Sequence, residues 1–471
     1  MNRKTLVFLV SVSCFAFLLR ASPHLFVIPF LGTEEGSLVY FCYRVLEGDF
    51  RYVAEYPHLP IFIIAGLSWV TGVPVWRVAT LWNPLVSALT VPLVYLLVRK
   101  LGGSELQALF GSLLFACLDV HVYRTTLLSG SEGFGIFLMF VFLNLYLSRK
   151  WLSFLVLPVL FTVHLLPLGM SILFVFIDQF VVHKPTRKTV FQVGLALTLT
   201  AILVNVYFPY RLASYRLFHL FEVFNPQNYL TLYNIEDLKT LLSTMTGTLL
   251  VYGWSIVFRH LFGEKKEATQ LFCLCLAVCL ALSFPFYSTV ISPYRILVYM
   301  GIFGALNFAL AFTGEGHKIV TVWMCVLMLS QITGLGWNVH NHIYYAPTRE
   351  ELEAVMWLKN RNSTIRYYNI GWDHVGMETL VVLFPHHGEN PFAKKNHTLD
   401  LWYPNLQGLE TPHTQYIIYS DRLKQNALFR VLTNRRVLYT PVPINDKWKN
   451  NPEWQPIYNQ SGVIIYERSR T

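Results

Sequence analysis

Hydrophobic residues occur along this 471-residue chain in long runs, and short basic clusters separate the runs. A helix needs about 20 apolar residues to cross a bilayer. We predict about eleven transmembrane helices, several of them short enough to be tilted or half-buried. Their expected ranges are 5–22, 79–98, 105–118, 133–148, 152–164, 168–182, 189–208, 245–262, 268–287, 295–313 and 318–336.

The basic clusters predict how these helices are oriented, because Lys and Arg accumulate on the cytoplasmic side of a membrane. The apolar segment 59–76 is the ambiguous one. If it lies in the outer interface instead of crossing, Arg99-Lys100 and the later basic clusters all become cytoplasmic. Pro57, Pro60 and Pro74 also suit a bent interfacial segment better than a straight span. We therefore expect a multi-pass integral membrane protein with a cytoplasmic N-terminus and an extracytoplasmic C-terminus.

The character of the chain changes after residue 337, where long apolar runs stop and charged residues, Asn, His and Pro become frequent. We predict two domains: a transmembrane domain, 1–337, whose first outer loop is 23–78, and an extracytoplasmic α/β domain, 338–471. A helix is expected to begin after Pro347, with acidic residues in its first turn. Strands are expected near 416–419 and 463–466.

Composition excludes an ordinary soluble enzyme, a disordered chain and a disulfide-stapled secreted module. The chain is 54% hydrophobic and 14% charged, whereas a soluble domain has about 25% charged residues. The net charge of +10 does not indicate nucleic acid, because the basic residues lie at the ends of apolar segments and are not gathered in one patch. The lipid bilayer is therefore an expected partner and nucleic acid is not.

Ionisable side chains gather on the predicted outer face, where their cost near a membrane makes them candidates for function. Carboxylates there suit chemistry on a lipid-linked substrate, as a general base on a hydroxyl or as ligands of a divalent cation. A fixed arginine can hold a phosphate leaving group. The candidates are Glu34, Glu35, His58, Asp119, His121, Arg124, Glu132, His164 and Arg295.

Four motifs follow one another in the first outer loop: Gly32-Thr33-Glu34-Glu35-Gly36, Tyr40, Leu46-Glu47-Gly48-Asp49-Phe50 and Tyr56-Pro57-His58-Leu59-Pro60. In this order they resemble the first outer loop of GT-C glycosyltransferases, multi-span enzymes that use polyprenyl-phosphate sugars. The family usually has Asp where Glu34 stands, whereas Glu35-Gly36 match directly.

The resemblance implies a fold of GT-C type and a reaction. An enzyme of this kind transfers a hexose or pentose from a dolichyl or undecaprenyl phosphate carrier to a protein, glycan or lipid acceptor on the outer face, with inversion. Glu34 is then the base or a metal ligand, and Glu35 belongs to the same catalytic site. Arg295 resembles the arginine that meets the lipid phosphate. The remaining expected substrate contacts are His58, Arg124, Glu132 and His164.

The second outer loop resembles the catalytic subunit of oligosaccharyltransferase in Tyr123-Arg124-Thr125-Thr126 and the run 129–133. Glu132 matches the second acid of that enzyme's acidic pair, but Gly130 stands at the first. Asp119 and His121 are alternative ligands, because residues two apart face the same way in an extended segment. A divalent cation, Mg²⁺ or Mn²⁺, is the one cofactor that these donors suggest.

Other interpretations stay open. Each candidate side chain has an ordinary structural explanation, as a solvated loop residue, a helix cap or an interfacial anchor. An oligosaccharyltransferase-like enzyme would move a whole lipid-linked glycan to Asn. A lipid or sugar transporter or flippase would place ionisable residues near mid-membrane and often has paired halves. A membrane scaffold would need none of the outer carboxylates.

Overall fold

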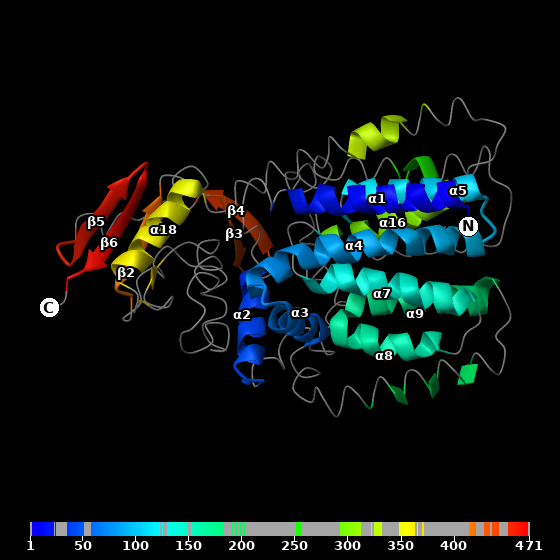
Figure 1. Ribbon diagram of the computed structural model, residues 1–471, viewed down its shortest axis with the longest axis horizontal. Helices are drawn as coiled ribbons and strands as arrows, with labels where there is room; N and C mark the ends of the chain where they lie inside the picture. Colours follow the sequence, from blue (N-terminus) through cyan, green and yellow to red (C-terminus); the bar gives the residue numbers. More distant parts are fainter. Residues whose placement is uncertain are drawn as a thin grey trace.

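The computed structural model places a bundle of helices beside a smaller α/β unit (Figure 1). It describes residues 2–22, 24, 35–50, 58–119, 121–122, 125, 130–148, 152–182, 190–191, 194–195, 198–199, 202, 251, 253–255, 293–311, 322, 325–331, 348–362, 365, 370–371, 414–420, 428–433, 436–441 and 451–469. The predicted spans 189–208, 245–262, 268–287 and 318–336 fall wholly or largely outside these residues.

The helices of the bundle agree closely with the remaining predicted spans. They are α1 (Arg3–Ser22), α4 (Val75–Lys100), α5 (Glu105–Cys117), α7 (Gly130–Leu147), α8 (Ser153–Val163), α9 (Leu165–Phe176) and α16 (Pro293–Ala311). A π-helical segment, Ile177–Val182, continues α9. Helix α4 begins before its predicted start, directly after Pro74, because proline has no N–H to contribute and suits the start of a helix.

The outward surface of the bundle is apolar. In the part of the chain that the structure describes, α1 and α4 are long and apolar enough to cross a membrane, and several shorter apolar helices accompany them. Outward side chains on α1, such as Leu6, Val7 and Leu18, are 49–58% exposed. A soluble protein rarely exposes contiguous apolar surface of this kind. The surface therefore fits association with a membrane.

Polar contacts show which helix ends meet at the N-terminal end of the bundle. The Thr5 hydroxyl donates to Glu105 at the start of α5. Lys100 Nζ, at the end of α4, donates to the carbonyl of Asn144 near the end of α7, at 2.6 Å. Gln107 Nε2 donates to the carbonyl of Leu310 at the end of α16, at 3.1 Å. The last turns of α1 and α5 and the first turns of α7 and α16 therefore meet at the opposite end.

Two short helices lie at that opposite end, which we call the α2 end (Figure 1). They are α2 (Glu35–Leu46) and α3 (His58–Thr71). Both pack through a buried apolar cluster against α4 and α7, using Leu38, Ile61, Trp82 and Phe134 among others. Helix α3 has 14 residues, a length similar to that of α5, α8 and α9. Its interfacial location stays a prediction from the charge pattern.

The exposed face of α3 is apolar as well, with Trp69 78% and Val70 75% exposed.

Helix α2 ends where Gly48 adopts φ +78°, a conformation that glycine adopts without steric cost. There the Gly48 and Asp49 N–H groups donate to the carbonyls of Val45 and Arg44, at 3.1 and 2.9 Å. This pattern is a Schellman termination, and it redirects the chain out of the helix.

The C-terminal unit combines one helix with β-structure and lies beyond the α2 end (Figure 1). Helix α18 (Arg349–Arg361) accompanies a sheet of order β1-β2-β6-β5. These strands are Ile370–Gly371, Tyr416–Ser420, Val463–Arg468 and Trp454–Gln460, and β3 (Leu428–Thr433) pairs with β4 (Arg436–Pro441). The β1–β2 pair is parallel and the other pairs are antiparallel. The expected helix and both expected strands are present.

One buried carboxylate joins α18 to this sheet. Glu351 accepts from the Thr348 N–H at 2.9 Å, and the Thr348 hydroxyl accepts from the Glu351 N–H, which together form a capping box. The other carboxylate oxygen of Glu351 accepts from the Ser420 hydroxyl on β2. Glu351 is fully buried, so these hydrogen bonds replace the water that the charged group loses.

Close packing of α7 against α9 gives a test of the bundle. A Cβ added at Gly135 would lie 2.6 Å from Cγ of Pro167, a rigid ring. We expect Gly135→Ala to cost about 1–3 kcal/mol through overpacking, which thermal melting of the purified protein in detergent would show as a lower Tm. Gly169→Ala is the matched control, because no atom lies within 4 Å of its added Cβ. Equal melting of the two variants would contradict the packing.

Candidate functional site

Buried polar side chains gather at the α2 end of the bundle, and we call them the buried polar cluster. Its members come from four helices and the segment between α5 and α7: Arg20, Asn83, Asp119, His121, Thr125, Glu132 and Gln331, each at most 6% exposed. Four of them, Asp119, His121, Thr125 and Glu132, belong to the second outer loop that the sequence predicts.

Arg20 is the most connected member of the buried polar cluster. It lies in the last turn of α1 and is fully buried. Its Nε donates to the Thr125 hydroxyl at 2.9 Å. One terminal nitrogen donates to the carbonyls of Ala16 and Ala116, at 3.0 and 3.1 Å. The other terminal nitrogen lies 2.9 Å from Nδ1 of His121. One guanidinium therefore joins α1, the end of α5 and the segment that follows α5.

The contact with Arg20 determines the state of His121. Arginine has only donors, so Nδ1 must accept and the ring proton must lie on Nε2. Burial, and then the positive charge of Arg20, hold the pKa of His121 well below its usual range. The imidazole is therefore neutral at pH 7, packed against the ring of Phe115 at 4.6 Å between centroids. Since a neutral imidazole has one lone pair, metal binding by His121 would require this hydrogen bond to break.

Asp119 and Glu132 are held by different neighbours. Asp119 is fully buried, and its backbone N–H donates to Oε1 of the Gln331 side chain at 2.6 Å. Glu132 lies in the first turn of α7. A Cβ added at the next residue, Gly133, would lie 2.8 Å from Oδ1 of Asn83 and 3.2 Å from Cγ2 of Thr125. The start of α7 thus contacts both α4 and the residue that Arg20 holds.

His164 lies at the same end, in the turn between α8 and α9. Its Nδ1 accepts from the Leu166 N–H at 3.2 Å and caps α9. The Cβ of His164 is 3.3 Å from the position that a Cβ on Gly135 would take. The ring therefore serves as a helix cap beside α7, one of the ordinary roles that the sequence allows.

For three of the remaining predicted site residues, the structure gives the position in a helix but not the side chain. Arg295 is the third residue of α16, which begins at the α2 end. Glu35 and His58 are the first residues of α2 and α3. The side chains of these three residues lie outside the described part of the structure, as do Glu34 and Arg124 entirely. The convergence of Glu34 on the buried polar cluster stays a prediction.

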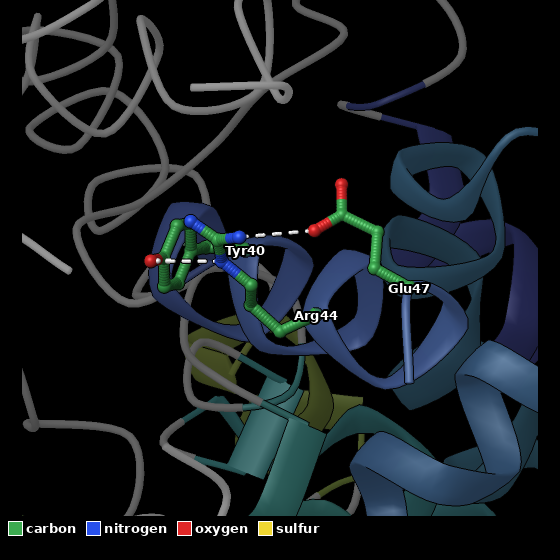
Figure 2. A network of polar contacts seen from close by, with 3 residues as sticks. All are labelled: Tyr40, Arg44 and Glu47. Atoms are coloured by element: carbon green, nitrogen blue, oxygen red, sulfur yellow. Dashed lines mark hydrogen bonds and ion pairs between the residues drawn. The ribbon is translucent and has the colours of Figure 1, made fainter. Parts of the chain in front are cut away.

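Helix α2 carries a polar network of its own (Figure 2). Arg44 Nε donates to the Tyr40 hydroxyl at 3.0 Å, and another guanidinium nitrogen lies 3.0 Å from a Glu47 carboxylate oxygen. The guanidinium also lies 5.1 Å from the centroid of the Tyr40 ring. These contacts at positions i, i+4 and i, i+3 stabilise the helix that follows Glu34. They connect two of the motifs that carry the GT-C resemblance.

A divalent cation finds no complete site among the described residues, where no three His, Cys, Asp or Glu side chains are grouped suitably for a metal. A hard cation such as Mg²⁺ prefers several oxygen ligands. Asp119 and Glu132 have suitable oxygens, but the guanidinium of Arg20 occupies Nδ1 of His121, the third candidate ligand. The described donor set does not fit a metal, and we derive no step through one.

Nothing in the sequence predicts that Arg20, Asn83 and Gln331 belong to the buried polar cluster. Arg20 resembles an ordinary charged residue at the end of a span, and Asn83 and Gln331 lie within apolar segments. The available signal for Arg20 is its position in the last turn of an otherwise apolar helix, where it can face inward as well as outward.

Comparisons with known proteins show the fold. No protein-family model matches the chain, and no curated protein matches its sequence. The Archaeoglobus fulgidus oligosaccharyltransferase in the apo form matches with a TM-score of 0.53 and 10% identity, over 89% of this chain and 70% of that chain. The A. fulgidus oligosaccharyltransferase tethered to an acceptor peptide with the NVT sequon matches with a TM-score of 0.52 and 11% identity, over 100% and 74%.

These likenesses show that the chain shares the fold of the Archaeoglobus fulgidus oligosaccharyltransferase. The distant structural relationship that the first outer loop suggests is therefore confirmed at the level of the fold. A shared fold does not by itself establish a shared activity.

Gln331 offers a test of the cluster. Gln331→Leu would leave the buried Asp119 N–H without its acceptor, which costs about 1–3 kcal/mol. We expect a lower Tm in detergent. The matched control is Ser330→Ala, because the Ser330 hydroxyl donates to the carbonyl of Leu327 within its own helical segment. A Gln331→Leu variant as stable as Ser330→Ala would show that this hydrogen bond contributes little.

Proposed function

We propose that this chain is an integral-membrane glycosyltransferase of GT-C type, which transfers a sugar from a polyprenyl phosphate carrier to an acceptor on the outer face of the membrane. The observation that carries the proposal is the buried polar cluster with Asp119 and Glu132 at the α2 end, within a fold similar to that of an oligosaccharyltransferase. The first outer loop, with the GT-C motifs, begins at this same end.

The proposed chemistry is an inverting displacement at the anomeric carbon. An acceptor oxygen attacks this carbon, and the bond to the carrier phosphate breaks with its electron pair. Glu34 takes the acceptor proton as general base, and Glu35 belongs to the same catalytic site. Arg295, at the start of α16, stabilises the departing phosphate. Asp119 and Glu132 shape the acceptor site, and His58, Arg124 and His164 complete the proposed substrate contacts.

The arrangement of helix ends supports the proposed sidedness. The N-terminal end carries Arg99 and Lys100 at the end of α4, as expected for a cytoplasmic face. The α2 end carries the buried polar cluster, with the C-terminal α/β unit beyond it (Figure 1). The apolar face of α3 suits the boundary between lipid and water. A lipid-linked donor can therefore stay in the outer leaflet while its sugar reaches the loops.

A second candidate is oligosaccharyltransferase-like transfer of a lipid-linked glycan to Asn. It is favoured by the fold itself, since the two structures described above are of an oligosaccharyltransferase and one of them is tethered to an acceptor peptide. A transporter is less well supported, because the buried polar cluster lies at one end of the bundle and not at the mid-membrane position expected of such proteins.

Glu34 is the residue on which the mechanism depends. We expect Glu34→Ala to lower sugar transfer in reconstituted vesicles by about 100- to 10,000-fold, the usual contribution of a general base. Tm in detergent should stay unchanged. The control is Glu353→Ala on α18, whose exposed ion pair with Arg349 should contribute little. Unchanged turnover in Glu34→Ala would remove Glu34 from the mechanism.

The choice of donor separates the two candidate functions. We expect vesicles supplied with single-sugar polyprenyl phosphates to yield product, because the mechanism needs one activated sugar on a phosphate. Vesicles supplied with oligosaccharide donors and an N-x-[ST] peptide should yield none. Mass spectrometry of the products would check this. A glycan attached to the peptide Asn would favour the oligosaccharyltransferase-like activity instead.

A further inference from the structure

We infer that Arg20 is a positioning residue, whose guanidinium holds Ala116, His121 and Thr125 in the arrangement that presents Asp119 to the substrate. The catalytic consequence rests on the proposed function, whereas the structural consequence does not. No motif in the sequence assigns a role to this arginine.

The burial of Arg20 is the first argument. An arginine at the end of a membrane helix can extend its charged head to the interface and keep it hydrated. Arg20 is fully buried instead, and its hydrogen-bond partners among the described residues are all uncharged: two carbonyls, one hydroxyl and one neutral imidazole. Uncharged partners do not offset desolvation as fully as a carboxylate would. The guanidinium is therefore better explained by its directional donors than by stability.

The geometry of the Arg20 guanidinium, whose N–H donors form a planar fork, is the second argument. Its planar donors bind Ala116, which precedes Asp119 in the sequence, and His121 and Thr125, which follow it. The Thr125 hydroxyl in turn donates to the His121 carbonyl at 2.6 Å, which ties these two residues together. A lysine could not reproduce the arrangement, because an ammonium is a point charge without a rigid fork.

The effect on His121 is the third argument. Arg20 occupies Nδ1, so Nε2–H is the remaining hydrogen-bonding group of the ring. His121 can therefore donate to an oxygen of the substrate, such as a hydroxyl or a phosphate oxygen, but it cannot take a proton while the contact lasts. Arg20 thus gives His121 the role of a fixed donor and leaves the role of base to a carboxylate.

The position of Arg20 in the chain extends this coupling. Helix α1 ends at Ser22 and leads into the first outer loop, where Glu34 lies. The same fork that holds the second outer loop therefore anchors the start of the first. Both sets of proposed catalytic residues depend on one side chain.

The test compares Arg20→Gln and Arg20→Lys with Arg99→Gln in the full-length protein. Arg99 is a matched control, because it donates to the Gly103 carbonyl at the opposite end of the bundle. Four quantities are measured for each variant: Tm in detergent, amide hydrogen exchange of peptides from residues 116–125 and from α4, and kcat and KM for the lipid donor in vesicles.

Both Arg20 variants should exchange faster in 116–125 with no change in α4. In both, kcat per folded molecule should fall by about 100-fold, as for a small misplacement of reacting groups, at unchanged KM. Arg99→Gln should change none of these quantities. A purely structural role would lower Tm without changing kcat per folded molecule, and that result would overturn the inference. Full activity in Arg20→Lys would overturn it too.

Two further outcomes are decisive. If Arg20→Gln does not fold, Thr125→Val removes one arm of the network without changing volume, and faster exchange in 116–125 is again expected; unchanged exchange would overturn the inference. If the unmodified protein transfers no sugar from any donor, the proposed function fails. The exchange measurement still decides whether Arg20 holds the segment.

Discussion

A charge buried inside an apolar helix bundle must make its hydrogen bonds within the protein, because no bulk water reaches it to replace them. The guanidinium of Arg20 meets this constraint with four contacts, to its own helix, to the end of α5 and to two residues that follow α5. These contacts limit where α1 and α5 can lie relative to each other, and they bring Asp119 and His121 to one end of the bundle.

The two ends of the bundle have different chemistry. At the N-terminal end, polar side chains cap helix ends: Lys100 donates to the Asn144 carbonyl and Gln107 to the Leu310 carbonyl. The α2 end instead carries buried ionisable groups and the two short helices α2 and α3, of which α3 exposes apolar side chains. Such asymmetry agrees with the proposed function, in which a lipid-linked substrate is bound at one end of the bundle.

Much of the fold could be predicted from the sequence. Runs of apolar residues located α1, α4, α5, α7, α8, α9 and α16 to within a few residues, because a helix that faces lipid must be apolar along its whole length. The interfacial location that the distribution of Arg and Lys predicts for 59–76 stays a prediction; α3, which has 14 residues, lies in this segment. The acidic first turn after Pro347 and the strands near 416 and 463 were also recognisable.

The buried polar cluster could be predicted in part, whereas its role as a site stays a prediction. Sequence motifs and charge determined which end of the bundle carries Asp119, His121 and Glu132, because alternating spans place those loops together. They could not determine what these residues contact. Asp119 is bound by Gln331, 212 positions away, and His121 is bound by an arginine from the first helix. Such pairs depend on how far each helix is rotated and at what depth it packs. Hydrophobic periodicity leaves both open, so only the tertiary structure decided that Arg20 turns inward and that His121 is a neutral donor.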